Sequence, residues 1–527
     1  MKAREAVSRV LPATIACLVA CAKPQGGGPP RVEIRPSDCA IPSQPLLRGI
    51  HSIVAERAMS CAVLDQGQVA CWGVQDLGRL GDGFEVKRRD LPTRVPGLQG
   101  VVAVTQGNDA TFARMADGSV RVWGPNRGGE FGDGSPDYHI AWAPRAVAQW
   151  GTIKQIAGGI PTCAIRSDDK VVCAGRARFR RMNEDTAAPG GTPVVVPGLE
   201  SAAGIAAGSG FTCALLGEGS VWCWGMADAG QLGNGGGEDQ DKPVHVRSLD
   251  PAVEIDAGSD TACARLAGGG VRCWGRSFAG YGLDHPEKWL RPVEIKGTRD
   301  ATQISIGDRV GCALLRDSTV ACWGESSYDG QLGDGSDETR GTVAGPVACV
   351  RDAVQVSVGD NHSCALLRDG TARCWGSGTY GAVGDGTHEI RKIPVAVLDA
   401  VEPAPDAERC PPGTTFKRGK GQDDLEAVAE WCETPDGKRE GMYVGRWATG
   451  QKLQQGGYVS GVRHGEWTRY YEHGEVVSKD RYEHGEPHGV WIAYSLHWRF
   501  AFASCFDHGR RVWQVSSEAE ANQKRCP

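Results

Sequence analysis

Pairs of cysteines ten residues apart recur about every fifty residues along this 527-residue sequence. The six pairs are Cys61 with Cys71, Cys163 with Cys173, Cys213 with Cys223, Cys263 with Cys273, Cys312 with Cys322, and Cys364 with Cys374. A seventh unit has Phe112 and Val122 at the two cysteine positions, so both partners are absent together. Such concerted loss is typical of covalently joined residues, and we therefore predict six disulfides within seven repeats. Disulfides on this scale indicate an oxidising compartment.

Each repeat has the pattern of a β-hairpin. The two cysteine positions lie on short apolar segments that are joined by a turn such as Asp369-Gly370. In the fourth unit, a three-residue loop at 217–219 would place the two cysteines directly opposite each other. Six units carry glycine five residues before the first cysteine position, and only the first has Glu56 there. With 74 glycines and 23% charged residues, the composition favours an all-β protein with little helix.

A second motif follows each hairpin. The hairpin ends in Cys-Trp-Gly, and a glycine-rich run comes next, as in 230–235 and 330–335. From about residue 47 to 400 the chain resembles the regulator of chromosome condensation repeats. This resemblance implies a seven-bladed β-propeller with one four-stranded blade for each repeat. The third unit departs from the pattern with Ala174 in place of tryptophan, and the fifth is eroded at 281–284.

The N-terminus predicts export. Basic residues precede the apolar run 10–20, which ends in Leu-Val-Ala directly before Cys21. The segment resembles the signal peptide and lipobox of bacterial lipoproteins, which implies that Cys21 is the lipidated first residue of the mature chain. Secretion with an incidental cysteine is the alternative. We expect an exported protein that is lipid-anchored in the bacterial cell envelope, at the outer membrane, and that contacts the membrane through its lipid only.

A second repeat begins beyond a proline-rich linker. Four glycines stand 24 residues apart, at Gly437, Gly461, Gly485 and Gly509. About 75 residues here resemble membrane occupation and recognition nexus repeats, which implies a small module of stacked β-hairpins. Such hairpins would bury an aromatic ladder, formed by Trp467, Tyr470, Tyr482, Trp491 and Tyr494.

Histidines of this module also recur 24 residues apart, as His464 with His488, His473 with His497, and His484 with His508. Equivalent histidines in neighbouring repeats would lie two strand spacings apart, roughly 9 to 10 Å. That separation is too large for shared coordination, so we interpret His-Gly as turn residues and predict no metal and no other cofactor.

These features divide the chain into a signal peptide (1–20), a lipidated N-terminus and tether (21–46), a propeller (47–402), a proline-rich, cysteine-containing linker (403–436), hairpin repeats (437–515) and a tail (516–527). Six further cysteines, at Cys39, Cys349, Cys410, Cys432, Cys505 and Cys526, allow fifteen connectivities. Proximity favours Cys410 with Cys432 and Cys505 with Cys526, which leaves Cys39 for Cys349.

The residues that follow Trp-Gly change freely inside a constant frame, which is typical of a recognition surface as well as of a tolerant loop. These variable positions are Asp76, Arg127, Asp228, Phe278, Tyr328 and Tyr380. The sequence has no nucleophile-elbow, zinc-protease or phosphate-loop motif, and a net charge of −6 disfavours nucleic acid as a partner. We expect an envelope-anchored protein that binds a protein or glycan through one propeller face. An extracytoplasmic enzyme with a central-channel site and a structural envelope scaffold without a specific ligand are the alternatives.

Overall fold

The computed structural model describes residues 35–526 with internal gaps at 40–41, 43, 84–87, 108, 176–190, 279–286, 326–328, 401–409, 412, 421–427, 448–451, 472–475, 496–498, 518–519 and 521–525. Cys21 and the predicted signal peptide lie outside the described residues. Among the described residues, no helix has the length and apolar character that a membrane span requires. The prediction of an all-β chain is confirmed.

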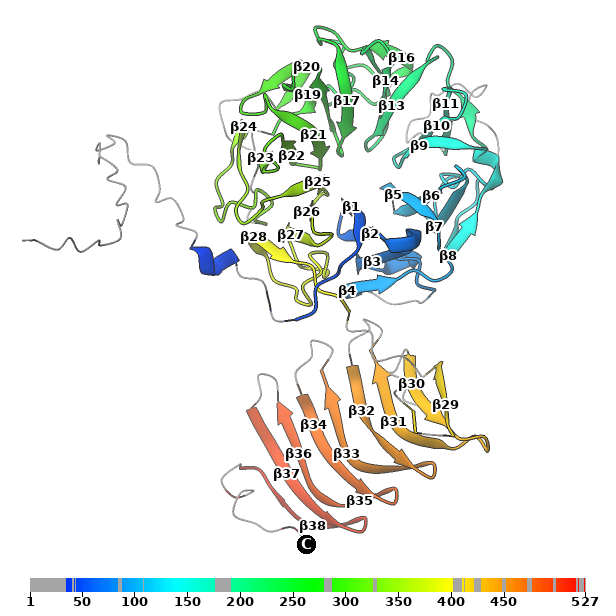
Figure 1. The fold of residues 1–527 in the computed structure, drawn as a ribbon, viewed down its shortest axis with the longest axis vertical. Helices are drawn as coiled ribbons and strands as arrows, with labels where there is room; N and C mark the ends of the chain where they lie inside the picture. The colour runs from blue at the N-terminus through cyan, green and yellow to red at the C-terminus, as the bar shows by residue number, and fades with distance from the viewer. Residues whose placement is uncertain are drawn as a thin grey trace, which may run out of the picture. The chain divides into compact units, whose positions relative to one another are not determined.

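Seven antiparallel sheets of four strands form the first part of the chain, and each sheet follows the sequence order. The blades are β1 (Ile50–Glu56), β2 (Met59–Leu64), β3 (Val69–Val74) and β4 (Arg88–Arg94); β5 (Val101–Gly107), β6 (Ala110–Met115), β7 (Val120–Asn126) and β8 (His139–Ala146); β9 (Ile153–Ala157), β10 (Thr162–Arg166), β11 (Val171–Ala174) and β12 (Val194–Val195); β13 (Ala202–Ala207), β14 (Phe211–Leu216), β15 (Val221–Gly225) and β16 (Gln240–His245); β17 (Ala252–Ala257), β18 (Thr261–Leu266), β19 (Val271–Arg276) and β20 (Lys288–Ile295); β21 (Ala301–Ile306), β22 (Val310–Leu315), β23 (Val320–Gly324) and β24 (Gly341–Pro346); and β25 (Ala353–Val358), β26 (His362–Leu367), β27 (Ala372–Gly376) and β28 (Arg391–Ala396). Figure 1 shows these sheets as the blades of a ring, with the first strand of each blade innermost.

The cysteine pairs lie on the second and third strands of their blades, directly opposite each other in register. All six pairs form disulfides with Cα–Cα distances of 4.0 to 4.1 Å. The bonds join Cys61 with Cys71, Cys163 with Cys173, Cys213 with Cys223, Cys263 with Cys273, Cys312 with Cys322, and Cys364 with Cys374. The predicted pairing is therefore the pairing in the structure.

The second blade keeps this register without cysteines. Phe112 on β6 faces Val122 on β7, and both side chains are buried. The paired apolar residues therefore fill the space that a disulfide fills in the other blades.

Tryptophans hold neighbouring blades together. Trp123 of the second blade is fully buried, and its indole N–H donates to the carbonyl of Arg79 in the first blade at 2.8 Å. The third blade has Ala174 at this position. There, Trp150 from the preceding 3-10 helix η4 (Ala148–Trp150) makes the contact between the blades. Trp150 is 1% exposed and donates to the carbonyl of Phe131 at 2.7 Å. A residue from outside the repeat frame thus restores the packing that the third repeat lacks.

The N-terminal segment closes the ring against the last blade. Leu46 forms a bridge with Leu398, and the backbone N–H of Leu47 donates to the carbonyl of Val397 at 3.1 Å. Cys39, at the end of the 3-10 helix η1 (Pro36–Cys39), is joined to Cys349 by a disulfide. Two short 3-10 helices, η2 (Asp65–Gly67) and η3 (Asp76–Gly78), lie in loops of the first blade.

The C-terminal part is one ten-stranded antiparallel sheet, formed by β29 (Thr415–Gly419), β30 (Val428–Glu433), β31 (Arg439–Arg446), β32 (Lys452–Val459), β33 (Val462–Tyr470), β34 (Val476–Glu483), β35 (Glu486–Pro487), β36 (Gly489–Ser495), β37 (Arg499–Asp507) and β38 (Arg510–Val515) (Figure 1). The assignment of 403–436 to a linker is wrong for β29 and β30, which pair as a hairpin and join the sheet. Disulfides Cys410–Cys432 and Cys505–Cys526 lie at the two ends of this region.

An aromatic ladder crosses this sheet. Successive ring contacts of 4.8 to 6.4 Å join Tyr443, Tyr458, Trp467, Tyr482, Trp491 and Phe506. The predicted ladder is thus correct for Trp467, which is 1% exposed, but Tyr470, Tyr482, Trp491 and Tyr494 are only partly buried. Burial is incomplete because the ladder lies on one face of a single sheet. Arg439 and Arg463 add cation–π contacts, with Arg463 4.2 Å from the centre of the Trp467 ring.

Candidate functional site

The loops that follow Trp-Gly and the loops between the first and second strands lie on the same side of every blade, because the strands are antiparallel. We call this side of the propeller the Trp-Gly face. The short Asp-Gly turns between the second and third strands lie on the opposite side. The described residues among the predicted binding positions, Asp76, Arg127, Asp228, Phe278 and Tyr380, belong to loops that follow Trp-Gly.

The innermost strands of the seven blades surround a central space, which we call the channel. On the Trp-Gly face, the channel is bordered by glycines at the ends of these strands. Gly258 packs directly on Gly307, and Gly307 packs on Gly359, so that a Cβ atom at either residue would overlap backbone of the next blade. In the first blade Glu56 occupies this position, and its backbone lies against Gly359. One carboxylate therefore enters a ring that is otherwise closed by backbone.

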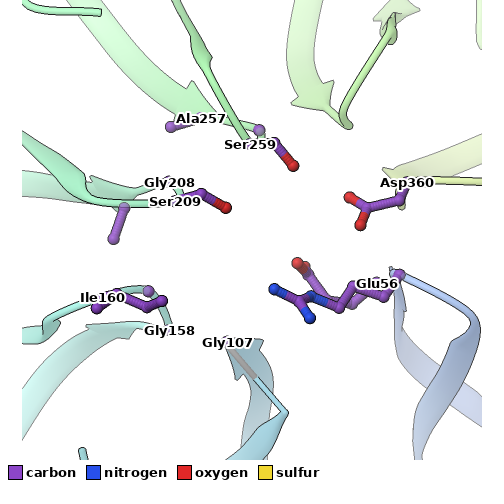
Figure 2. A pocket seen from close by; sticks show the side chains of 13 residues that line it. Glu56, Gly107, Gly158, Ile160, Gly208, Ser209, Ala257, Ser259 and Asp360 are labelled. Carbon is purple, nitrogen blue, oxygen red and sulfur yellow. The ribbon is translucent and has the colours of Figure 1, made fainter. Parts of the chain in front are cut away.

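At the described positions directly after this ring stand Arg57, Gly159, Ser209, Ser259, Asp308 and Asp360. All of them except Asp308 line the opening. Figure 2 shows Glu56, Ser209, Ser259 and Asp360 directed toward the same space. This space, which we call the channel mouth, has a volume of about 30 Å³. That is room for a few water molecules at most.

The channel mouth is a desolvated, mainly acidic environment. Burial, aided by the nearby charge of Asp360 and opposed by Arg57, raises the pKa of Glu56 to about 8. Burial also raises the pKa of Asp360 to about 6, aided by Asp308 and opposed by Arg57. Because burial disfavours its charged form, Glu56 is mostly protonated at neutral pH.

A larger hollow, which we call the rim pocket, lies beside the channel mouth and has a volume of about 230 Å³. It is lined by Ala58, Asp329, Asn361, Ser377, Thr379, Tyr380 and Ala382. Ala58 and Asn361 directly follow Arg57 and Asp360 in the chain, so the two hollows adjoin. Tyr380 is 48% exposed, and burial raises the pKa of Asp329. The rim pocket thus combines an accessible aromatic ring with a partly desolvated carboxylate.

The other predicted binding residues are distributed around the ring. Arg127 forms an ion pair with Asp109 at 3.0 Å, and Asp76 pairs with Arg79 at 3.3 Å. Asp228 is exposed and accepts a hydrogen bond from Gln231 at 3.1 Å. These three residues do not line the rim pocket with Tyr380, so the described positions do not form one site. Tyr328 lies outside the described residues.

The prediction of Phe278 as a binding residue is wrong. Its side chain is 1% exposed and packs edge to face against Trp289 and Trp323, with ring centres 5.7 and 6.4 Å away. Phe278 therefore fills the core between the fifth and sixth blades.

The residues of the channel mouth were missed as site residues although the sequence carries a signal for them. Glu56 is the one exception to glycine at its position among seven repeats, and Asp308 and Asp360 follow the glycines of their own repeats. A residue with a side chain at a position where the other repeats have glycine marks a place where that side chain projects from a crowded backbone. A comparison of the repeats position by position would therefore have identified Glu56.

Models described as regulator of chromosome condensation (RCC1) repeat match residues 203–231, 353–382 and 218–265. The E3 ubiquitin-protein ligase HERC2 of Homo sapiens is 33% identical over 132 residues, which are 24% of this chain and 3% of the ligase. The ultraviolet-B receptor UVR8 of Arabidopsis thaliana is 33% identical over 133 residues, which are 24% of this chain and 30% of the receptor. The chain therefore carries RCC1 repeats but spans less than a third of these relatives.

A solved structure of yeast RCC1 (Prp20), bound to Kap60, has a similar fold. The TM-score is 0.57 at 18% sequence identity, and the match covers 75% of this chain and 94% of the yeast chain. At this identity the likeness concerns the fold alone, and it agrees with the seven-bladed propeller described above.

Proposed function

We propose that this protein is an exported, envelope-anchored binding protein whose Trp-Gly face recognises a protein partner. Nine disulfides join all eighteen cysteines of the described residues, which supports folding in an oxidising compartment. Lipidation at Cys21, in a bacterial lipoprotein signal, would hold the chain at the outer membrane. The C-terminal sheet is proposed to be a module of membrane occupation and recognition nexus type.

The observation that carries the proposal is the junction of the channel mouth and the rim pocket. Tyrosine is a residue type that often anchors interfaces, and Tyr380 is exposed next to partly desolvated carboxylates. The complementary surface is a protein segment with a lysine or arginine side chain, directed at Glu56 and Asp360, and an apolar group against Tyr380. Glycans without free amino sugars offer no such cation, so we favour a protein.

An extracytoplasmic enzyme with a site in the central channel is less well supported. Acid and base groups do converge at the channel mouth, as such an enzyme would need. However, sites for small molecules usually have volumes of about 300 to 1,000 Å³, whereas the channel mouth offers about 30 Å³. The space suits the tip of one side chain better than a substrate.

The proposed contact has a pH dependence. A cation within about 4 to 6 Å of a carboxylate stabilises its ionised form. Binding a basic side chain would therefore remove the proton that Glu56, with its pKa of about 8, carries at neutral pH. The affinity is expected to rise as the pH increases from about 6 to 8 and to level off above.

Site-specific photo-crosslinking in native envelopes tests the proposal. A photoreactive phenylalanine analogue at position 380 should capture one predominant protein, whereas the same analogue at exposed Glu218, in a turn of the opposite face, should not. Adding Asp360→Asn should weaken capture from position 380. Equal capture from both positions, or none from position 380, would count against the Trp-Gly face.

The anchor is tested separately by Cys21→Ser. This variant should move from the membrane fraction to the soluble fraction, because it lacks the residue that is lipidated. If it stays with the membranes in detergent-free extracts, lipidation at Cys21 is not what retains the chain.

A further inference from the structure

The hairpin turns of the C-terminal sheet bring histidines of different repeats together. His484-Gly485 and His508-Gly509 both have positive φ angles, of 51° and 89° and of 46° and 81°, as a type I′ turn requires. The N–H of Gly509 donates to the carbonyl of Pro487 at 2.8 Å, which fixes this turn beside the preceding repeat. His508 therefore lies next to His488, which directly follows Pro487, and not next to its own equivalent.

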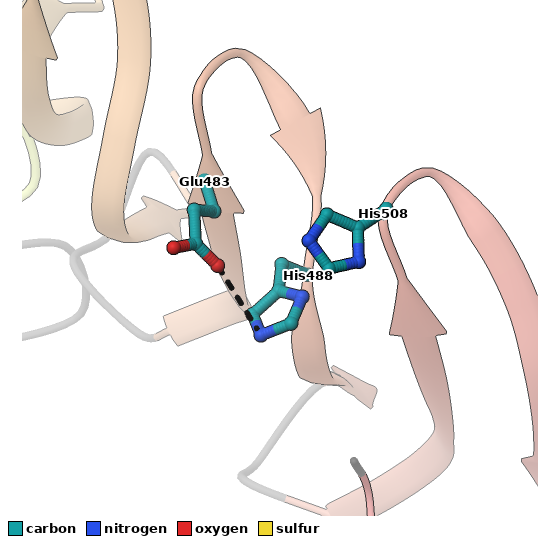
Figure 3. Close-up of side chains that lie close together, drawn as sticks. All are labelled: Glu483, His488 and His508. Atoms are coloured by element: carbon teal, nitrogen blue, oxygen red, sulfur yellow. Dashed lines mark ion pairs between the residues drawn. The ribbon is translucent and has the colours of Figure 1, made fainter.

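This offset changes the expectation from the 24-residue spacing. That spacing compared equivalent histidines, which are two strands apart. In the structure the partners are His488 and His508, with ring centres 5.2 Å apart, and Glu483 at the end of β34 completes the cluster. One ligand atom from each of the three residues lies within 4.8 Å of the other two. Figure 3 shows the three side chains close together, with Glu483 at the end of a strand and His508 on a turn.

We propose that Glu483, His488 and His508 bind a divalent transition-metal ion, and Zn²⁺ in the first place. Two imidazoles and one carboxylate are a common ligand set for such ions. With metal–ligand bonds of about 2.0 to 2.1 Å in a tetrahedral site, neighbouring ligand atoms lie about 3.3 to 3.4 Å apart. The distance between Nε2 of His488 and a carboxylate oxygen of Glu483 is 3.4 Å. His508 is 73% exposed at its side chain and can turn toward this pair.

A neighbouring carboxylate supports the assignment. Asp507 Oδ1 lies 2.7 Å from Nδ1 of His508, so that this nitrogen donates to the carboxylate and Nε2 is left to bind the ion. Metal-binding histidines are usually oriented in this way. In addition, Nδ1 of His488 is buried without a hydrogen bond and lies 4.0 Å from Oδ1 of Asp507, so the same carboxylate stands near both imidazoles. The exposed side of the cluster leaves room for water as a fourth ligand.

The preceding repeat contains a natural control. His464 and His484 are paired in the same way, with ring centres 5.7 Å apart. However, Val459 stands 24 residues before Glu483, where the carboxylate would be needed. This second pair has two imidazoles only, and we expect it to bind the ion much more weakly.

Titration of the proposed mature chain, which begins at Cys21, with Zn²⁺ tests the proposal, with the Cys21 thiol blocked beforehand and any affinity tag removed. Calorimetry should show one tight equivalent, and Co²⁺ should give the visible absorption of a four-coordinate site. Glu483→Gln, His488→Asn and His508→Asn should each weaken binding by about 10-fold or more, whereas the control His464→Asn should not. Circular dichroism would verify that the variants are folded.

A gain of binding gives a second, independent readout. Val459→Glu supplies the missing carboxylate beside His464 and His484, and it should raise the stoichiometry from one to two equivalents. Val459 is 40% exposed, so the substitution does not disturb the core. Unchanged Zn²⁺ affinity in both His488→Asn and His508→Asn, or an equal loss in His464→Asn, would overturn the proposal.

Discussion

The propeller and the C-terminal sheet are both built from short antiparallel hairpins, but they bury their side chains differently. In the propeller each sheet packs between two others, and tryptophans such as Trp150 become fully buried. In the C-terminal sheet the aromatic ladder lies on one face, and Trp491 at its later end is only partly buried. A closed ring of sheets thus gives each hairpin packing on both faces, whereas a single sheet depends on one aromatic face and stacked arginines.

Reduction of the disulfides should produce the largest difference in stability between the propeller and the C-terminal sheet. The propeller contains seven of the nine bridges, and each contributes about 2 to 4 kcal/mol to the free energy of unfolding. The sheet region contains two. In scanning calorimetry with a reductant, the midpoint temperature of propeller unfolding is expected to fall much further than that of the C-terminal sheet. Equal shifts would mean that the bridges do not distinguish the regions.

Truncation of one tryptophan in each region sharpens the comparison. Trp150→Ala removes a fully buried indole and its hydrogen bond to the carbonyl of Phe131. It should lower the free energy of unfolding by about 3 to 5 kcal/mol. Trp491→Ala removes a partly exposed ring and should cost roughly half as much. Urea unfolding with fluorescence from the remaining tryptophans would measure both values. If both variants lost a similar free energy of unfolding, packing on both faces of each blade would not be what makes the propeller tryptophans more stabilising.

The sequence predicted the propeller well because its regularly repeated motifs resemble a known repeat family. The direct opposition of the cysteines, and of Phe112 with Val122, follows from hairpin geometry alone. Trp150 was not predicted to replace the missing tryptophan, because it lies outside the frame and reaches its place through the fold. Phe278 was misplaced because the sequence does not show whether an aromatic residue in a variable loop faces solvent or the core between two blades.

The pairing of His488 with His508 was missed because the sequence period aligns equivalent residues. The structure brings non-equivalent ones together, through the hydrogen bond from Gly509 to Pro487. Periodicity shows which residues share a role within the repeats. It does not show how one repeat is offset against the next, since backbone hydrogen bonds decide that offset.

Glu56→Gln should stabilise the propeller in a pH-dependent way. The pKa of Glu56 rises from 4.5 to about 8 on folding, so the folded state holds a proton that the unfolded state has lost between these values. The free energy of unfolding therefore falls as the pH rises from about 4.5 to 8. Glutamine removes this effect because it does not ionise. At pH 8 the free energy of unfolding of the variant should be about 1 to 3 kcal/mol higher than that of the parent, with partial exposure taken into account.

Thermal unfolding at pH 5 and pH 8 would measure this difference. The gain should be small at pH 5, and it should appear in the propeller transition only. The exposed Glu218→Gln, on the opposite face, is the matched control and should show no gain at pH 8. A gain of equal size at both pH values would mean that ionisation of Glu56 is not its cause.

Tyr380→Ala should have the smallest effect on stability and the clearest effect on binding. Its ring is 48% exposed, so the free energy of unfolding should change by no more than about 0.5 kcal/mol. If the rim pocket is the centre of an interface, affinity for the captured partner should fall by about 1 to 2 kcal/mol, and Tyr380→Phe should keep most of it. Tyr482→Ala in the C-terminal sheet is the converse control: it breaks ring contacts with Trp467 and Trp491 and should lower stability without changing affinity. Unchanged binding in folded Tyr380→Ala would move the interface away from the rim pocket.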